Sequence, residues 1–455
     1  MRELRPVVVT QPVPGRVTLG TARRKLVAAE RGQSVLVVGP TQSRKTSGFA
    51  VPAVLEWQGP LVAASVKTDL VRHTMAWREQ VGPTWVYDPT GSTGLPAATW
   101  SPLDASATWM GARRTASSLT EVARASVGSL TDGDFWYATA GKLLAPLLLA
   151  AAVSGRTMTD VVRWIDSQEV DEVADALVDA GEHQALQAAH ASWARDDRQR
   201  SAVYTTAETV VEAFADPEVA ASADRWPGAS GGDGARTVDV RRLVESTATL
   251  YLCAPTHDQR RLRPVFATLV SQVLEAAYER VARQGTPLDP PLLVVLDEAA
   301  NVAPLADLDV LASTAAGHGV QLVTVWQDLA QLRSRYDVRA ATVVNNHRVK
   351  VFLSGICDPD TLEHASTLIG EAERRQRTTT VDAWGTTSST DALVPRRLVA
   401  PDALRRIPPG SAVVLSGHLP PVRLDLRPWQ DNRLLRNRAE HLGCHGGRDP
   451  TSTRW

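Results

Sequence analysis

The sequence contains little cysteine, and this scarcity excludes two classes of protein. Its 455 residues include three cysteines, Cys253, Cys357 and Cys444, which lie far apart. None of them has the paired spacing of a zinc site or of a small disulfide framework. The sequence therefore favours a reducing, cytosolic compartment over a secreted fold linked by disulfides.

An excess of charge of either sign is also absent. The chain has 49 Lys and Arg residues and 50 Asp and Glu residues, which give a formal net charge of -1. Such a chain does not attract nucleic acid through its overall field, so any contact with DNA has to come from local basic groups. The runs "RRLR" at 260–263 and "PRR" at 395–397 are candidates, and a solvated surface is the alternative for both.

No long hydrophobic run is present either. The most apolar stretch, "LLAPLLLAAAV" at 143–153, contains Pro146, and it is shorter than the roughly 20 residues that span a bilayer. The first residues, "MRELRPVVVTQPVPGRV", carry no long apolar run. We therefore expect a buried helix at 143–153 and no transmembrane segment in this chain.

Short apolar runs separated by helical patterns are what the sequence does contain. With 44% hydrophobic and 22% charged residues, the chain is apolar enough for two or three globular cores. Short buried strands that alternate with helices predict an α/β fold with a mainly parallel sheet covered on both faces. The expected strands lie at residues 34–39, 59–65, 84–89, 247–255, 291–299, 320–326 and 347–355.

The first of these runs is followed at once by a glycine-containing loop, "GPTQSRKT". In the pattern GxxxxGK[ST], backbone N–H groups wrap phosphates, the lysine reaches the terminal phosphates and the hydroxyl holds Mg²⁺. The order of strand, loop and helix is the one that this pattern requires. The loop therefore predicts an ATP and Mg²⁺ site formed by Gly39, Pro40, Thr41, Gln42, Ser43, Arg44, Lys45 and Thr46.

One residue of the loop departs from the pattern, because Arg44 stands where the second glycine is expected. A side chain there is expected to clash or to impose an unfavourable backbone angle, at a cost on the order of 1–3 kcal/mol. This cost would weaken binding without abolishing it, since Lys45 and the helix N-terminus remain. A turn that contains Gly and Lys by chance is the alternative interpretation.

Two further strand ends carry candidate catalytic residues. The run "PLLVVLDEA" ends in Asp297 and Glu298; the aspartate is suited to hold Mg²⁺ and the glutamate to activate the attacking water. An acidic pair that caps the next helix is the alternative. The run "VQLVTVW" is followed by Gln327, which we expect to sense the terminal phosphate, although an isolated glutamine at a strand end often has no function.

The alternation of strands and helices stops between about residues 105 and 230, where Ala, Leu and Val recur at helical spacing. This pattern predicts an inserted all-α domain. The insertion divides the nucleotide-binding domain into a first part at 34–104 and a second part at 231–427. We expect residues 1–33 to form an N-terminal leader with an early strand and residues 428–455 to form a C-terminal tail.

Taken in order, the motifs of this chain resemble the type IV coupling proteins of conjugation, with the nearest match to the TraG/TraD-like branch of actinobacteria. The resemblance covers about residues 34–425. It rests on the phosphate loop, "SVKTDL" at 65–70, "VYDPTG" at 86–91, "WSPL" at 100–103, "DFW" at 134–136, "LDEAANVAPL" at 296–305, "WQDLAQLRSRY" at 326–336 and "NNHRVKVFLSGICDPDTLEHASTLIGE" at 345–371.

The resemblance implies a RecA-like P-loop ATPase that pumps DNA as a homohexamer and carries an inserted all-α domain. It implies that the chain moves single-stranded DNA with an attached relaxase into a type IV secretion channel. The implied location is the cytoplasm at the inner face of the cell membrane. Because family members usually have an N-terminal anchor that this chain lacks, docking there would depend on partners.

A second departure from the family concerns catalysis. Relatives commonly supply an arginine across the subunit interface just before the strand that bears the glutamine, and this chain has Ala316 there. Together with Arg44, this leaves the ATPase activity open. Arg333 and Arg335 follow Gln327 and offer a replacement charge, with a solvated helix face as the alternative role.

Four functions compete at this point. They are an ATP-driven DNA pump of the coupling-protein type, a degenerate subunit that binds nucleotide weakly and recruits or supports others, a translocase of double-stranded DNA, and a small-molecule kinase. The ordered motifs favour the first, whereas Arg44 and Ala316 favour the second. The kinase has little support because no motif for an acceptor substrate or a lid accompanies the phosphate loop.

Overall fold

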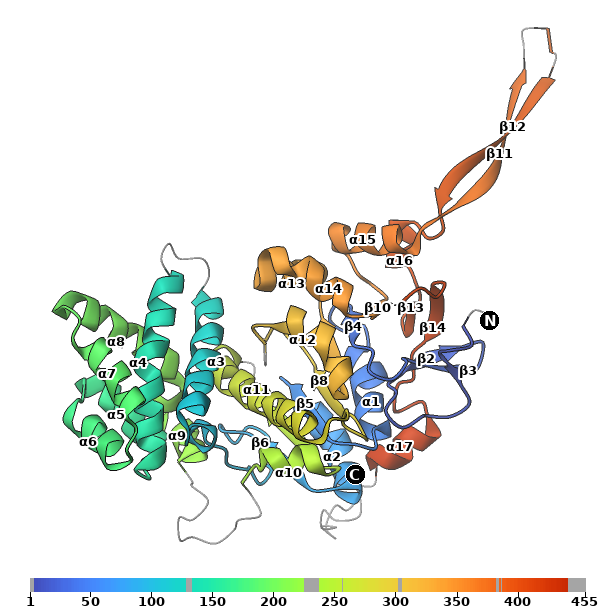
Figure 1. The fold of residues 1–455 in the computed structure, drawn as a ribbon. Helices are drawn as coiled ribbons and strands as arrows, with labels where there is room; N and C mark the ends of the chain where they lie inside the picture. The colour runs from blue at the N-terminus through green and yellow to red at the C-terminus, as the bar shows by residue number, and fades with distance from the viewer. Residues whose placement is uncertain are drawn as a thin grey trace, which may run out of the picture.

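The computed structural model describes residues 4–127, 133–224, 237–255, 257–301, 305–381, 384–385 and 387–440. The expected boundary between residues 230 and 231, and residues 441–455 of the expected tail, lie outside these ranges. The described chain forms a large sheet with helices on both faces, a helical domain at one side and a projecting two-stranded hairpin (Figure 1).

One twelve-stranded sheet runs through the described part of the chain, in the order β1-β3-β2-β14-β13-β10-β4-β9-β8-β5-β7-β6. Its neighbours from β10 to β6 are all parallel, so the prediction of a mainly parallel α/β core is confirmed. Each parallel strand falls inside an expected run. Their bounds are β10 (Val349–Leu353), β4 (Val35–Val38), β9 (Val320–Trp326), β8 (Leu292–Leu296), β5 (Leu61–Ser65), β7 (Thr249–Cys253) and β6 (Thr84–Tyr87).

Side chains from each of these strands enter two separate hydrophobic cores, one on each face of the sheet. In β4, Leu36 and Val38 belong to one core, and Val35 and Val37 belong to the other. Because both faces are buried, the strands are mostly apolar and do not alternate regularly between apolar and polar residues. The first core is covered by α11 (Gln259–Gln284), α12 (Leu308–Thr314) and α14 (Ala340–Asn346), the second by α1 (Val51–Glu56), α2 (Asp69–Val81) and α17 (Arg433–Glu440).

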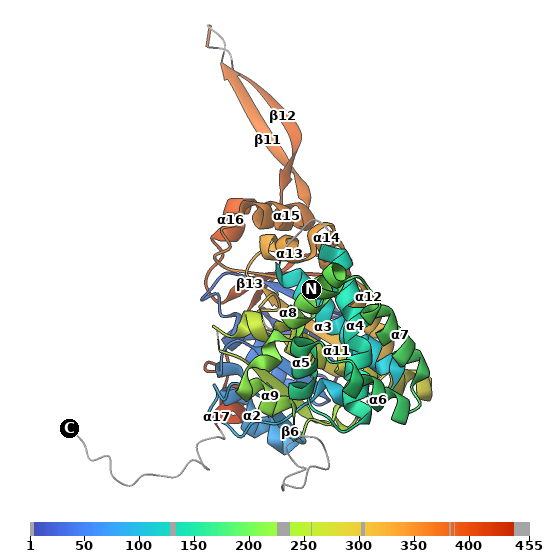
Figure 2. The same ribbon diagram turned by 90° about the vertical axis from the view of Figure 1, so that its left-hand side faces the viewer.

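The helical insertion lies beside the sheet, beyond α11, and is nearest the viewer in Figure 2. Its long helices α3 and α4 pack against each other, and α3 also packs against α11, which joins the insertion to the α/β core. The described residues between the start of α3 and the end of α9 form helices joined by turns and short loops, without a strand. The helices are α3 (Trp109–Val127), α4 (Gly133–Val153), α5 (Met158–Ser167), α6 (Asp171–Asp179), α7 (His183–Trp193), α8 (Asp197–Val211), the short η3 (Glu212–Ala215) and α9 (Pro217–Ala223).

Helix α4 contains the most apolar stretch of the chain. It has 21 residues and is the one helix of the described chain that is long and apolar enough to cross a membrane. The apolar run at 143–153 is the C-terminal half of this helix, so the expected helix is confirmed. Most of its side chains are buried, with α3, α7 and α8 packed around it, and this burial is typical of a core helix.

The N-terminal segment differs from the expected leader, because its strands belong to the large sheet. β1 (Val8–Val9), β2 (Thr18–Ala22) and β3 (Lys25–Ala28) pair with one another, and β2 pairs with β14 (Val422–Asp425). β14 in turn pairs with β13 (Ser411–Ser416), which pairs antiparallel with β10. Both ends of the chain thus extend the sheet on the same side.

The C-terminal segment also differs from expectation, since its described residues do not form a tail. Helix α17 packs against α1 and α2, with Leu435 fully buried. Arg438 donates a 2.9 Å hydrogen bond to the carbonyl of Leu55, and its guanidinium lies 4.5 Å from the centre of the Trp77 ring. These contacts hold the segment against the helices that follow the phosphate loop.

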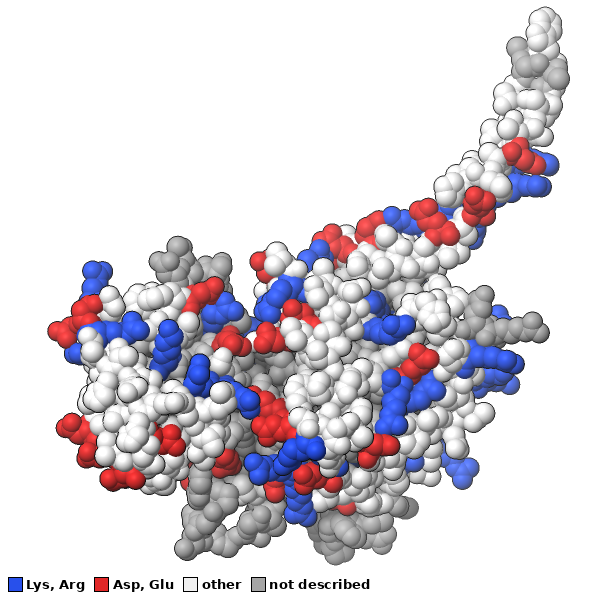
Figure 3. Space-filling model, in the orientation of Figure 1, with Lys and Arg blue, Asp and Glu red and all other residues white. Residues whose placement is uncertain are grey.

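A hairpin that the sequence analysis did not identify projects from the body of the protein (Figures 1 and 2). Its strands β11 (Glu371–Val381) and β12 (Thr387–Arg397) pair only with each other in the described chain, and their side chains are almost all exposed. Figure 3 shows charged side chains along the lower half of the hairpin and mainly uncharged ones toward its tip. At the base, Arg397 pairs with Glu363 of α15 (Pro359–Ile369).

Candidate nucleotide-binding site

The phosphate loop connects β4 to a helical turn, Thr46–Ala50, that continues into α1. The Gly39 N–H donates to the carbonyl of Trp326 at 3.0 Å, which ties the start of the loop to the end of β9. A Cβ at position 39 would lie 2.7 Å from Leu353 and 2.8 Å from the Ser43 hydroxyl. Only glycine therefore fits at the first position of the loop.

Arg44 has the unfavourable backbone angle that was expected for a residue with a side chain at this position. Its φ is 64°, in the left-handed region that side chains with a Cβ disfavour, and φ of Gln42 is 65°. The expected strain is therefore confirmed. The guanidinium forms a 3.5 Å ion pair with Asp431, and both side chains are largely exposed. Such a pair stabilises the protein by less than about 1 kcal/mol, so it does not offset the strain in full.

Lys45 lies inside the loop and is buried. Its ammonium donates hydrogen bonds to the carbonyls of Gly39 and Pro40, at 2.7 and 2.8 Å. Burial lowers the pKa of Lys45, while the nearby Asp297 and Glu298 carboxylates act in the opposite direction. The cation is thus held at the centre of the loop by acceptors that a phosphate group can replace.

Thr46 and Asp297 are in direct contact. The Thr46 hydroxyl donates to Asp297 Oδ2 at 2.8 Å, and the Ser65 hydroxyl lies 3.4 Å from the same oxygen. The other oxygen, Oδ1, is buried without a hydrogen-bond partner in the described chain. Burial raises the pKa of Asp297 to about 6, against the lowering effect of the Thr46 hydrogen bond.

These oxygens fit a magnesium ion. Mg²⁺ prefers oxygen ligands and is bound in such sites by one or two carboxylates or hydroxyls together with water and phosphate. Thr46 offers a hydroxyl, and Asp297 offers a buried oxygen, Oδ1, that no group of the described chain engages. Both residues were expected as metal ligands from the sequence, and the structure brings them together.

Glu298 and Gln327 lie at the same edge of the sheet. β9, which ends just before Gln327, is flanked in the sheet by β4 and β8, so the three strand ends are neighbours. Glu298 has a φ of 64°, and its Oε2 accepts a 3.3 Å hydrogen bond from the Asn301 amide. The N–H of Gln327 donates to the Gln331 side chain at 3.1 Å. The structure thus brings five of the expected site residues to the carboxyl ends of adjacent parallel strands, where ligands bind in open α/β sheets. They are Lys45, Thr46, Asp297, Glu298 and Gln327.

Three residues of this region were not identified as site residues from the sequence. Ser65 ends β5, the strand next to β8, and strand adjacency is the signal that would have pointed to it. Asn301 follows Glu298 by one turn. Arg263, part of the basic run at 260–263, donates to Asn301 and does not lie on a solvated face, because its side chain is partly buried.

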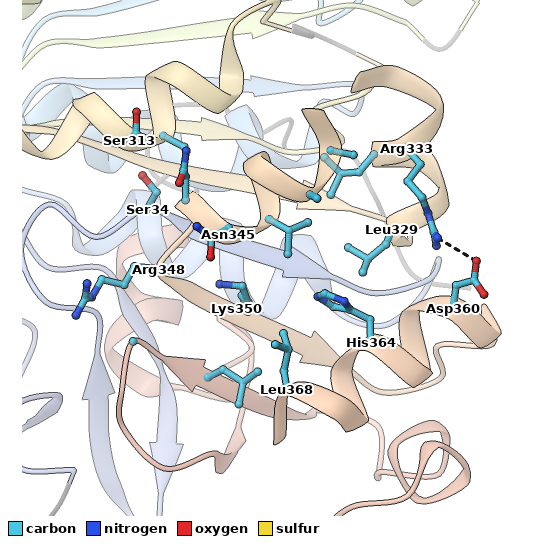
Figure 4. A pocket seen from close by; sticks show the side chains of 18 of the residues that line it. Ser34, Ser313, Leu329, Arg333, Asn345, Arg348, Lys350, Asp360, His364 and Leu368 are labelled. Atoms are coloured by element: carbon cyan, nitrogen blue, oxygen red, sulfur yellow. Dashed lines mark ion pairs between the residues drawn. The ribbon is translucent and has the colours of Figure 1, made fainter. Parts of the chain in front are cut away.

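Ala316 and Arg333 lie at a different place, a cavity of about 950 Å³ that no residue of the phosphate loop lines (Figure 4). Gly32, Arg348 and Lys350 also line it. Arg333 is exposed and forms a 3.0 Å ion pair with Asp360, which fits the solvated helix face. Arg335 is partly buried, so its side chain is not on a solvated face, and this burial lowers its pKa to about 10.

A strand, a phosphate-wrapping loop and a helix beside the carboxylate of a neighbouring strand define a P-loop nucleotide-binding fold. Residues 7–437 match the family model described as type IV secretory system conjugative DNA transfer, and the chain belongs to this family.

Curated relatives agree with this assignment. The chain is 25% identical over 409 residues to the conjugal transfer protein TraG of Escherichia coli, covering 83% of this chain and 62% of that protein. It is 23% identical over 420 residues to the protein VirD4 of Rhizobium rhizogenes, covering 89% and 60%. The chain thus spans about three fifths of the length of these relatives.

A solved structure shares the fold. The plasmid coupling protein TrwB in complex with ADP and Mg²⁺ matches with a TM-score of 0.69 at 20% identity, covering 92% of this chain and 90% of that one. This confirms the predicted fold class, a RecA-like P-loop fold with a mainly parallel sheet and a helical domain.

Proposed function

We propose that this chain is an ATP-driven DNA translocase, a coupling protein that recruits relaxase-bound single-stranded DNA to a type IV secretion channel during conjugative transfer. The observation that carries the proposal is the contact between Thr46 and Asp297 beside the buried Lys45, in a member of the conjugative DNA transfer family. ATP with Mg²⁺ is the proposed cofactor, and the TrwB complex with ADP and Mg²⁺ supports it.

Each residue then has a defined role. Lys45 exchanges its two loop carbonyls for phosphate oxygens, and the loop N–H groups that follow Pro40, at residues 41–46, bind the rest of the phosphate chain. Thr46 and Asp297 hold Mg²⁺, which when bound neutralises part of the phosphate charge. Glu298 accepts a proton from the attacking water, and Gln327 orients that water.

The proposed assembly is a homohexamer at the inner face of the cell membrane, in contact with single-stranded DNA, the relaxase and components of the secretion channel. Family membership supports these partners. A degenerate subunit that binds nucleotide weakly is the second candidate, and the left-handed Arg44 together with Ala316 favours it. A translocase of double-stranded DNA is the third, since it uses the same core.

Turnover of ATP by the purified chain, measured alone and with single-stranded or double-stranded DNA, tests the proposal. We expect hydrolysis that single-stranded DNA stimulates and that Lys45→Ala abolishes. Stimulation by double-stranded DNA only would support the third candidate. If the chain bound nucleotide but showed no turnover in all three conditions, the result would support the degenerate subunit and refute the pump.

A further inference from the structure

A chain of hydrogen bonds leads from Glu298 to helix α11. The side-chain amide of Asn301 donates to Glu298 Oε2 at 3.3 Å. Arg263 of α11 donates to Asn301 twice, from Nη2 to Oδ1 at 3.3 Å and from Nε to the main-chain carbonyl at 3.1 Å. Both the side chain and the backbone of Asn301 are therefore held by one guanidinium.

The guanidinium decides which way the amide of Asn301 points. An asparagine side chain has one acceptor oxygen and one donor nitrogen, and the two can exchange places by a flip. With Oδ1 accepting from Arg263, the NH₂ group has to face Glu298. A carboxylate that accepts from this fixed donor is itself restricted in orientation, which matters for a base that has to reach one water molecule.

The same helix is tied to the helical insertion within one turn of Arg263. Arg261 donates to Asp216 at 2.7 Å, and Asp216 caps the N-terminus of α9 by accepting from the N–H of Glu218 at 2.8 Å. α11 also packs along α3. The insertion is therefore in contact with α11, and α11 contacts Asn301 through Arg263.

We propose that Asn301 is a positioning residue for Glu298 and that Arg263 fixes Asn301, so that ATP hydrolysis is coupled to the position of the helical insertion. The inference rests on the proposed function, in which Glu298 activates water. It goes further by naming the residues that connect the base to the helical insertion, which we expect to contact DNA or the relaxase because it carries none of the phosphate-binding motifs.

Two substitutions test the positioning role in the full-length chain. Asn301→Ala and Arg263→Gln should each lower kcat at least tenfold while the Kd for ATP stays within twofold, because binding and orientation of the base are separate. Arg263→Lys should fall between wild type and Arg263→Gln, since an ammonium cannot make both bonds of the fork. Arg283→Gln on the same helix, exposed and 3.9 Å from Glu245, is the matched control and should behave as wild type.

An unchanged kcat in Asn301→Ala would overturn the positioning role. A change in ATP affinity as large as the change in kcat would also overturn it, because it would indicate a general distortion of the site. If the wild-type chain turned over no ATP, the proposed function and this inference would fail together. If the wild type and both variants turned over ATP at the same rate, the inference alone would be refuted.

The coupling is tested by Asp216→Asn, which removes the ion pair with Arg261 far from the nucleotide. We expect turnover without DNA to stay within twofold of wild type and the stimulation by single-stranded DNA to fall at least threefold. Full stimulation in Asp216→Asn would overturn the coupling. A wild-type chain that hydrolyses ATP without any stimulation by DNA would count against both the coupling and the proposed DNA pump, while the Asn301→Ala result would still decide the positioning role.

Discussion

Thr46 and Asp297 are separated by 251 positions in the chain, yet a hydrogen bond of 2.8 Å joins the threonine hydroxyl to the aspartate carboxylate. They meet because β9 alone separates β4 from β8 in the sheet, and the loop that follows β4 brings Thr46 to Asp297, which comes directly after β8. The contact leaves Oδ1 of Asp297 buried without a hydrogen-bond partner in the described chain. Burying a carboxylate in this way costs stability and provides a metal ligand.

Asp297→Asn should stabilise the nucleotide-free protein at pH 7. The pKa of Asp297 is raised from 3.8 to about 6 by burial, so the folded protein binds more protons than the unfolded chain between these values, and this group's contribution to stability falls as pH rises through that window. Asparagine removes the titration. The free energy of unfolding of Asp297→Asn should be close to that of the wild type at pH 4 and exceed it by about 3 kcal/mol at pH 7. Urea denaturation at both pH values measures this difference. An equal difference at both pH values would contradict the assignment to Asp297.

Binding of Mg²⁺ with nucleotide should weaken as the pH falls below about 6. The Asp297 carboxylate has to lose its proton before it can hold the cation, and its pKa is raised to about 6. We expect about a fivefold loss of Mg²⁺-dependent affinity between pH 6 and pH 5. Titration calorimetry with ADP, with and without Mg²⁺, measures it. The same pH dependence without Mg²⁺ would point to the phosphate groups or to another residue.

Replacing Arg44 separates backbone strain from charge. Arg44→Gly and Arg44→Ala both remove the weak ion pair with Asp431, but only glycine relieves the Cβ clash at φ of 64°. Arg44→Gly should therefore have a free energy of unfolding about 1 kcal/mol above that of Arg44→Ala. Chemical denaturation of the two variants under identical conditions provides the comparison. If the alanine variant were the more stable of the two, strain at this position would not be the explanation.

Glu298→Gln should bind ATP and fail to hydrolyse it. The amide has the same size and still accepts the hydrogen bond from Asn301, but it cannot take a proton from water. We expect kcat to fall at least a hundredfold with the Kd for ATP within threefold, which single-turnover measurements resolve. Turnover near the wild-type rate would remove Glu298 from the mechanism and leave water or another carboxylate as the base.

Lys45→Ala should strongly weaken nucleotide binding and leave the fold intact. The ammonium contributes hydrogen bonds to the Gly39 and Pro40 carbonyls, which water can replace in the variant. Losing a charge-assisted contact with phosphate should raise the Kd roughly a hundredfold, equivalent to about 3 kcal/mol. Lys142→Ala, an exposed lysine on α4, is the control. Unchanged affinity in Lys45→Ala would show that the nucleotide binds elsewhere.

The parallel strands could be predicted from the sequence because burial on both faces leaves a strong signal. β8 and β9, for example, consist of residues that are all buried; β8 is continuously apolar, β9 is apolar except for Gln321 and Thr324, and the two strands end abruptly before Asp297 and Gln327. The phosphate loop could also be predicted from the sequence, because its residue types follow from the chemistry of phosphate binding. The parts of the site that were predicted are those that lie directly after such strands.

The parts that could not be predicted carry weak local signals. Strands β11 and β12 have almost no buried side chains, and neighbouring Thr and Ser residues at 378–380 and 387–390 give no alternation. Helix α17 buries only Leu435 and Ala439, too few residues for an apolar period. Asn301 and Arg263 depend on tertiary contacts between a loop and α11, and neither belongs to a recognisable spacing.

The hairpin formed by β11 and β12 also has a mechanical consequence. Each strand has 11 residues, which at about 3.4 Å per residue makes a ribbon of roughly 35 Å. Its base is fixed to α15 through Arg397 and Glu363, so the ribbon acts as a lever arm. A rotation of about 10° at the base would carry the tip through roughly 6 Å for an arm of this length. Small changes in the angle of α15 are thereby converted into large displacements at a distance from the body of the protein.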